Sequence, residues 1–270
     1  MFKIKEYDLG DQCERIGYYP EVVQDIQESK KQFKTGIKKG YEYVMTREQK
    51  DAMNKDRSIQ RAKTKIRRIT QRYNMRYMWT LTFSKKYLQT FNSVNQNVSN
   101  YDTGNVDDVW RLWKSFLKRC KDYGLEFNYI VTLEVQEKRL KETGEKVFHF
   151  HFITDKRIPV NRDQAKKSGK KYSMSELWTH GFSFVTFKKS KKKLAHLYVI
   201  KYLTKLVDEI GKGQNRYRIK RGLVIPVSEF FVNEFDSFFT TIESEKMAKN
   251  SYAVLGDKLE IFWCIYDKSG

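Results

Sequence analysis

The clearest pattern along the chain is a series of short segments in which apolar and polar residues alternate. One of them places Trp79, Leu81 and Phe83 on one side and two threonines on the other. Because successive side chains of a β-strand point to opposite faces of a sheet, each such segment is predicted to be a strand. The segments with this pattern are residues 77–83, 127–136, 147–153 and 182–187.

Apolar residues recur at helical spacing between these strands. Residues 47–72 contain neither glycine nor proline, and a narrow apolar stripe predicts a basic helix there. A second helix is predicted to be capped by Asp107 or Asp108 and to end near Gly124. A third is predicted over residues 194–210. This order of strands and helices predicts an α+β fold.

The strand at residues 147–153 carries a distinctive polar pair. His149 and His151, two of only four histidines in the chain, share one face, and three phenylalanines take the other. Two neutral imidazoles at this spacing can bind a metal ion, or they can be ordinary polar residues on a half-buried strand. The strand taken alone favours neither interpretation.

A third ligand is expected from the strand before the histidines. The charged connection at residues 137–146 contains Thr143 and Gly144, which are typical of a hairpin turn. Folding that hairpin places either Glu134 or Gln136 on the face of the two histidines. The register of the hairpin decides which of them lies nearer, and the sequence leaves both open.

The helix at residues 194–210 presents an unusual polar face. Four residues at helical spacing, Tyr198, Lys201, Tyr202 and Lys205, fall together opposite a fully aliphatic face. A phenol beside cations suits a nucleophile that acts on a phosphate. The alternative is that the tyrosines fill a groove at the edge of the core.

The charge of the chain indicates a polyanionic partner. Its 53 Lys+Arg residues exceed its 33 Asp+Glu residues, which gives a net charge of +20. No apolar run approaches the ~20 residues that a membrane span needs, so nucleic acid is favoured over a membrane. Three cysteines far apart in the sequence suit reduced thiols and a cytoplasmic location.

Basic residues gather in three segments that are expected to contact DNA phosphates. The alternative for such segments is a solvated surface. The candidate residues are Arg57, Arg61, Lys65, Arg68 and Arg72 in the predicted basic helix, Lys188 and Lys189 before the third helix, and Arg216, Arg218 and Arg221 after it.

Three residue sets, in their order along the chain, resemble the motifs of HUH endonucleases, specifically the replication initiators of rolling-circle plasmids and single-stranded DNA phages. The sets are Thr-Leu-Thr-Phe at 80–83, His-Phe-His at 149–151, and Tyr-x-x-Lys-Tyr-x-x-Lys at 198–205. The resemblance implies a central antiparallel, RRM-like sheet of about five strands with helices on one face. The polar strand sides would form the active face.

The resemblance also implies roles for the site residues. Tyr198 matches the nucleophile, and Tyr202 matches a possible second one. Glu134 best matches the third metal ligand beside the two histidines, with Gln136 as its competitor because the connection between the two strands is longer than the family's. The expected cofactor is Mn²⁺ or Mg²⁺.

The implied reaction is nicking and joining of single-stranded origin DNA through a 5′-phosphotyrosine. Lys201 and Lys205 would neutralise phosphate charge, and a host helicase and polymerase are the expected partners. A competing interpretation is a non-catalytic RRM-like nucleic-acid-binding protein. Within the same fold, a single-tyrosine transposase or a relaxase would use the same residues.

The chain is predicted to have three parts. Residues 1–56 form an N-terminal extension, residues 57–225 the nicking domain, and residues 226–270 a small α+β cap that includes an aromatic strand at 259–266.

Overall fold

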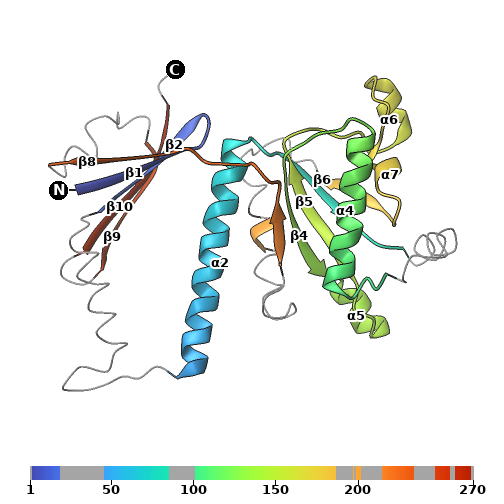
Figure 1. Ribbon diagram of the computed structural model, residues 1–270, viewed down its shortest axis with the longest axis horizontal. Helices are drawn as coiled ribbons and strands as arrows, with labels where there is room; N and C mark the ends of the chain where they lie inside the picture. The colour runs from blue at the N-terminus through green and yellow to red at the C-terminus, as the bar shows by residue number, and fades with distance from the viewer. Residues whose placement is uncertain are drawn as a thin grey trace. The chain divides into compact units, whose positions relative to one another are not determined.

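The computed structural model of the chain describes residues 2–18, 46–84, 101–186, 197, 199–201, 215–233, 247–255 and 259–268 (Figure 1). The chain divides into two compact units. One unit is Arg61–Leu223, and the other joins Met1–Gln60 to Val224–Gly270. Within the described residues, no helix is both long enough and apolar enough to cross a membrane.

The unit Arg61–Leu223 is built on a five-stranded antiparallel sheet with the order β6-β3-β5-β4-β7. This confirms the prediction of an α+β fold with a central antiparallel sheet of about five strands. The strands are β3 (Tyr77–Leu81), β4 (Tyr129–Val135), β5 (Phe148–Thr154), β6 (Ser183–Thr186) and β7 (Tyr217–Ile219).

The core of this unit lies on the phenylalanine face of β5. Figure 1 shows helix α4 (Val106–Asp122) against that side of the sheet. The ring of Trp113 in α4 lies 5.1 Å from that of Phe150 and 5.2 Å from that of Phe152, between ring centroids. All three side chains are fully buried. The prediction that these aromatic residues face the helices is therefore confirmed.

Helix α4 is capped by a residue that precedes both of the predicted caps. The side chain of Asn105 accepts hydrogen bonds from the backbone N–H groups of Asp107 at 2.9 Å and Asp108 at 3.3 Å. The prediction that Asp107 or Asp108 is the cap is therefore wrong. Both carboxylates instead lie in the first helical turn, where negative charge is favourable beside the helix N-terminus.

The basic helix α2 (Arg47–Arg72) buries a narrow stripe, as predicted. Ala62, Ile66 and Ile69 are buried, while Ile59 near the middle of the helix is only partly buried. Arg57, Arg61 and Lys65 are exposed, and Arg68 and Arg72 are partly exposed. The charged faces of this helix are thus accessible to solvent.

The connection between β4 and β5 is not a simple hairpin. A short helix, α5 (Glu137–Thr143), fills it and ends at Gly144, whose φ is 69°. The prediction of a turn at Thr143 and Gly144 is wrong, because a glycine in the left-handed region equally ends a helix. A second correction concerns residues 160–172, predicted to be a loop, where α6 (Arg162–Lys167) forms before α7 (Met174–Leu177).

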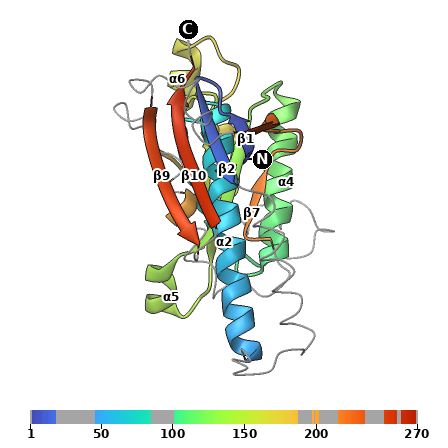
Figure 2. The same ribbon diagram turned by 90° about the vertical axis from the view of Figure 1, so that its left-hand side faces the viewer.

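The other unit holds a second five-stranded sheet with the order β8-β1-β2-β10-β9 (Figure 2). Strand β1 pairs with β8, and β2 pairs with β10, so both ends of the chain contribute to one sheet. The sequence did not predict this pairing. The strands are β1 (Phe2–Asp8), β2 (Gln12–Tyr18), β8 (Val227–Val232), β9 (Met247–Leu255) and β10 (Leu259–Asp267).

A buried ion pair links the central strands of that sheet. The guanidinium of Arg15 in β2 donates to the carboxylate of Glu6 in β1, with 2.7 Å between Nη2 and Oε2. The hydroxyl of Tyr266 in β10 donates to the same carboxylate oxygen. One acceptor therefore joins three strands, two from the N-terminal end of the chain and one from its C-terminal end.

Replacing Gly181 with alanine should destabilise the unit Arg61–Leu223. A Cβ atom at Gly181 would lie 2.0 Å from the carbonyl oxygen of Thr82 and 2.8 Å from the backbone nitrogen of Ser84. The entry to β6 must then move away from the segment after β3, and we expect the free energy of unfolding to fall by about 3 kcal/mol in urea titrations.

Gly144→Ala is the matched control, because open space surrounds Gly144 and only its positive φ opposes a side chain. That substitution should cost about 1 kcal/mol. Equal losses in the two variants would contradict the close backbone approach at Gly181.

Candidate metal centre on the histidine face

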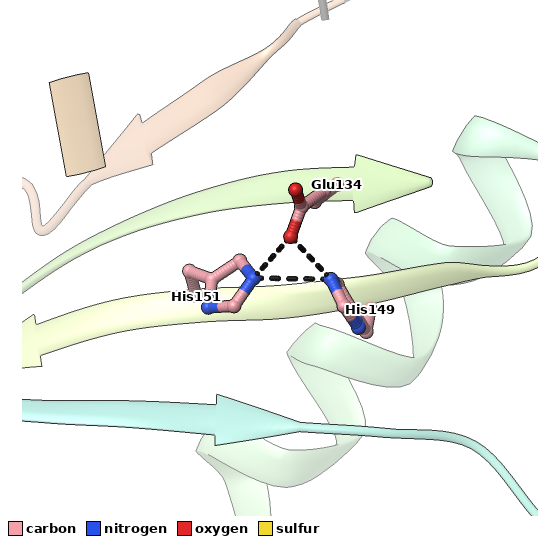
Figure 3. A group of neighbouring side chains, drawn as sticks. All are labelled: Glu134, His149 and His151. Atoms are coloured by element: carbon pink, nitrogen blue, oxygen red, sulfur yellow. Dashed lines mark hydrogen bonds and ion pairs between the residues drawn. The ribbon is translucent and has the colours of Figure 1, made fainter. Parts of the chain in front are cut away.

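The register of β4 and β5 brings three potential ligands together. Glu134 pairs directly with His149, and Thr132 pairs with His151. Because side chains alternate along each strand, Glu134, His149 and His151 project from the face opposite the phenylalanines. Figure 3 shows the three side chains converging on one point from the two adjacent strands.

The ligand atoms of this cluster are in close contact. Oε2 of Glu134 lies 2.7 Å from Nε2 of His149 and 2.7 Å from Nε2 of His151. The two Nε2 atoms are 3.0 Å apart. The side chains are only 5–16% exposed, so bulk water competes weakly for these contacts.

The carboxyl group of Glu134 is ionised in this cluster. Burial raises its pKa, but hydrogen bonds from His149 and His151 have the larger combined effect in the opposite direction. The pKa of the Glu134 carboxyl therefore lies well below its usual range. An ionised carboxylate is the form that binds a cation.

The donor set fits a single divalent ion. All three donor atoms lie within 4.8 Å of one another. An ion with metal–ligand bonds of about 2.0–2.2 Å keeps neighbouring ligands about 3 Å apart. The observed separations of 2.7–3.0 Å match that spacing. Two imidazole nitrogens and one carboxylate oxygen suit Mn²⁺ and tolerate Mg²⁺ when further oxygen ligands complete the shell.

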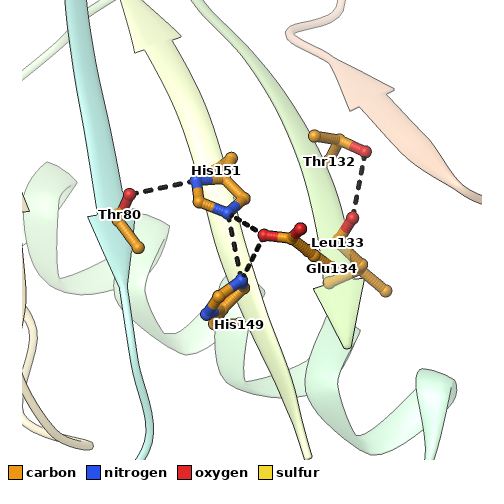
Figure 4. A network of polar contacts seen from close by, with 6 residues as sticks. All are labelled: Thr80, Thr132, Leu133, Glu134, His149 and His151. Carbon is orange, nitrogen blue, oxygen red and sulfur yellow. Dashed lines mark hydrogen bonds and ion pairs between the residues drawn. The ribbon is translucent and has the colours of Figure 1, made fainter. Parts of the chain in front are cut away.

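A threonine orients one of the imidazoles. Oγ1 of Thr80 in β3 lies 3.0 Å from Nδ1 of His151, the ring nitrogen that faces away from Glu134 (Figure 4). A hydroxyl can donate or accept. Thr80 can therefore hold the ring while Nε2 contacts Glu134 and equally while Nε2 binds a metal ion. The sequence placed Thr80 on this face but assigned it no role.

The polar network extends across the sheet to β7. Oγ1 of Thr132 donates to the carbonyl oxygens of Arg216 at 3.2 Å and Leu133 at 3.3 Å. Thr132 is fully buried directly beside His151. Its hydroxyl thus anchors the chain at the start of β7 to the strand that carries Glu134.

Gln136 does not share the position of Glu134. It lies one residue beyond the end of β4 and directly precedes α5. Its backbone N–H donates to the carbonyl oxygen of Val147 at 2.8 Å. The structure therefore brings Glu134, and not Gln136, to the two imidazoles.

The residues expected to perform nucleophilic attack fall mostly outside the described part of the chain. Tyr198, Tyr202 and Lys205 lie outside the described residues, as do Lys188 and Lys189. Lys201 is described, and its side chain is exposed in a helical stretch at residues 199–201. The roles of all these residues stay predictions.

The predicted DNA-contacting arginines near β7 differ in their surroundings. Arg221 is exposed, and Arg216 is partly exposed. The guanidinium carbon of Arg218 lies 4.3 Å from the ring centroid of Trp110 in α4. Burial lowers the pKa of Arg218. Its pairing with Val131 places it on the core side of the sheet, so a contact to DNA from that residue stays a prediction.

Residues 76–207 match a family model described as a replication-associated protein of the ORF2 type. The matched segment contains β3, Glu134, both histidines and Tyr198. This family comprises rolling-circle replication initiators, so the resemblance found in the sequence is confirmed. Neither a curated protein nor a solved structure matches the chain.

Removing the two imidazoles should abolish metal binding without unfolding the protein. We expect isothermal titration of the wild type with Mn²⁺ to show one site and that of a His149→Ala/His151→Ala variant to show none. Gln136→Ala is the control and should bind Mn²⁺ as the wild type does. Retained binding by the double variant, with an unchanged circular dichroism spectrum, would refute the cluster as the metal site.

Removing the Thr80 hydroxyl should weaken the site indirectly. Thr80→Val keeps the shape of the side chain but leaves Nδ1 of His151 without this contact, and we expect Mn²⁺ affinity to fall about tenfold. Thr82→Val is the control, because the Thr82 hydroxyl contacts the carbonyl oxygen of Phe182 and no imidazole. If the two valine variants lose the same affinity, the hydroxyl of Thr80 does not orient His151.

Proposed function

Because residues 76–207 match a replication-associated protein family of rolling-circle replication initiators, we propose that this chain nicks and rejoins single-stranded origin DNA. The observation that carries the proposal is the cluster of Glu134, His149 and His151 on one face of the sheet. It supplies a cation site within the matched segment, on a strand face that the aromatic core leaves available.

The three residues of the cluster would hold one Mn²⁺ or Mg²⁺ ion. When bound, such an ion polarises a phosphodiester and offsets the charge that develops on its oxygens. Glu134 contributes a negative charge that favours a cation, while Thr80 keeps the ring of His151 aimed at it. The buried core behind the strand fixes the positions of all three ligands.

Tyr198 is the proposed nucleophile, by its match to the third motif. Its phenolic oxygen, having lost its proton to water, attacks the scissile phosphorus and forms a new P–O bond. The bond from phosphorus to the 3′ oxygen breaks, and that oxygen takes up a proton. The products are a 5′-phosphotyrosine and a free 3′-OH. Lys201 and Lys205 would neutralise the charge of the bound phosphate.

The reaction is reversible because the phosphotyrosine keeps the energy of the phosphodiester. A later 3′-OH can attack the same phosphorus, release the tyrosine and reseal the strand. Tyr202 would carry out a second transfer in a two-tyrosine pathway. A host polymerase would extend the first 3′-OH, and a host helicase would open the duplex ahead of it.

The exposed arginines and lysine of α2 support binding of the DNA backbone. Arg57, Arg61 and Lys65 lie on the exposed side of that helix, and the chain carries a net charge of +20. Such charges attract phosphates without regard to base sequence. A non-catalytic nucleic-acid-binding protein would share this charge, but it would have no use for a buried two-histidine, one-carboxylate cluster.

Tyr198→Phe should abolish covalent attachment to DNA. We expect the wild type with Mn²⁺ to form an SDS-resistant adduct with labelled single-stranded oligonucleotides of random sequence. The phenylalanine variant should form none but should bind the same mixture normally, because only the attacking oxygen is lost. An adduct at wild-type yield from Tyr198→Phe would rule out this nucleophile.

Tyr202→Phe is the matched control for that experiment. If only one tyrosine acts, this variant should form the first adduct at the wild-type yield. A wild-type protein that binds the oligonucleotides but never forms an adduct, at any Mn²⁺ concentration, would favour the non-catalytic alternative.

A further inference from the structure

An exposed phenylalanine stands in line with the metal cluster. Phe184 in the edge strand β6 pairs with Thr80, and Thr80 pairs on its other side with His151. Directly paired residues of antiparallel strands share a face, so Phe184 and His151 project from the same side of the sheet. They lie two strands apart, which is about 10 Å. The side chain of Phe184 is 58% exposed.

A second phenylalanine extends this exposed edge. Phe182 lies two residues before Phe184 and is 56% exposed. Its carbonyl oxygen accepts hydrogen bonds from the backbone N–H of Thr82 at 2.9 Å and from Oγ1 of the same residue at 3.3 Å. The backbone at Phe182 therefore continues the β6–β3 pairing toward the row that contains His149.

The strand pattern shows that these rings are not displaced core residues. Val185 lies directly after Phe184 and packs against the hydrophobic core. Because β6 alternates its faces, a core-facing Val185 requires Phe184 to face away from the core. Two large aromatic residues exposed on the same edge leave apolar surface in water, which commonly marks a binding site.

We propose that Phe184, assisted by Phe182, is a stacking platform for unpaired bases of the DNA strand whose phosphate lies at the Glu134–His149–His151 cluster. This proposal rests on the proposed function for the identity of the strand. A phenylalanine ring offers an apolar face on which any base can stack, which suits a contact independent of sequence. Bases in a duplex are already stacked and paired, so such a platform selects single-stranded DNA.

The charge of the protein agrees with this partner. A peptide or a second copy of the chain would need complementary acidic or apolar surface, whereas the net charge of +20 favours a polyanion. Phosphate contacts and base stacking together are the usual combination in single-stranded DNA binding. The platform would fix the position of bases next to the scissile phosphate, while the basic residues hold the backbone.

Phe184→Ala should weaken binding of single-stranded DNA about tenfold. The probe is a fluorescein-labelled oligothymidylate of about 20 nucleotides, followed by anisotropy in EDTA so that no cleavage occurs. Phe184→Trp should restore the affinity, because it keeps an aromatic face. Phe231→Ala is the control, because Phe231 is 54% exposed but lies in the other compact unit.

Two further probes separate stacking from other effects. The salt dependence of binding should have the same slope in Phe184→Ala and in the wild type, because no phosphate contact is lost. On an oligonucleotide made of abasic residues, Phe184→Ala and the wild type should bind equally. An equal loss on the abasic chain, or no loss on oligothymidylate, would overturn the proposal.

The outcomes also distinguish this proposal from the proposed nicking activity. If Tyr198→Phe still forms adducts but Phe184→Ala weakens binding of oligothymidylate, the platform stands and the nucleophile is wrong. If nicking occurs as proposed while Phe184→Ala binds like the wild type, the platform is rejected. A change in self-association of Phe184→Ala, with DNA binding intact, would assign the edge to protein contacts and likewise reject the platform.

Discussion

The site depends on the pairing of β4 with β5. Strand β5 carries three phenylalanines on one face and two histidines on the other, so a slip of one residue would exchange the two sets. Burial of Phe150 and Phe152 against Trp113 opposes such a slip, because the slip would expose large aromatic surface and bury imidazoles in the core. The same packing that stabilises the sheet therefore determines that Glu134 faces His149.

This coupling explains how a set of polar groups is held with little freedom. The ligands come from two adjacent strands, and Thr80 from a third strand contacts His151. Each ligand thus sits on a rigid element whose opposite face is buried. Preorganised ligands lose little conformational entropy when a cation binds, which favours binding of an ion with open positions for a substrate phosphate.

Much of this arrangement follows from alternation along the sequence. The strands, the shared face of the two histidines and the pair of candidates Glu134 and Gln136 could all be predicted, because the side-chain period of a strand is two. The register that separates Glu134 from Gln136 could not. It depends on α5, a short helix of high polarity whose end at Gly144 resembles a hairpin turn in sequence.

Features set by non-local contacts were also missed. The pairing of β1 with β8 and of β2 with β10 joins segments from opposite ends of the chain, and no local pattern encodes it. The packing of Arg218 on Trp110 depends on the pairing of β7 with β4, which sets the side of the sheet that Arg218 faces. A basic segment read without its partner strand is naturally assigned to DNA. The cap at Asn105 was missed because two aspartates follow it, and all three side chains are good helix caps.

The central claim is that Glu134, His149 and His151 bind one divalent ion through two imidazole nitrogens. Pulsed electron paramagnetic resonance of the Mn²⁺-loaded protein, uniformly labelled with ¹⁵N, tests it most directly. The structure predicts hyperfine coupling to two imidazole ¹⁵N nuclei, reduced to one in a His149→Ala variant. Bound Mn²⁺ without any ¹⁵N coupling would show that the ion is held elsewhere and would contradict this account.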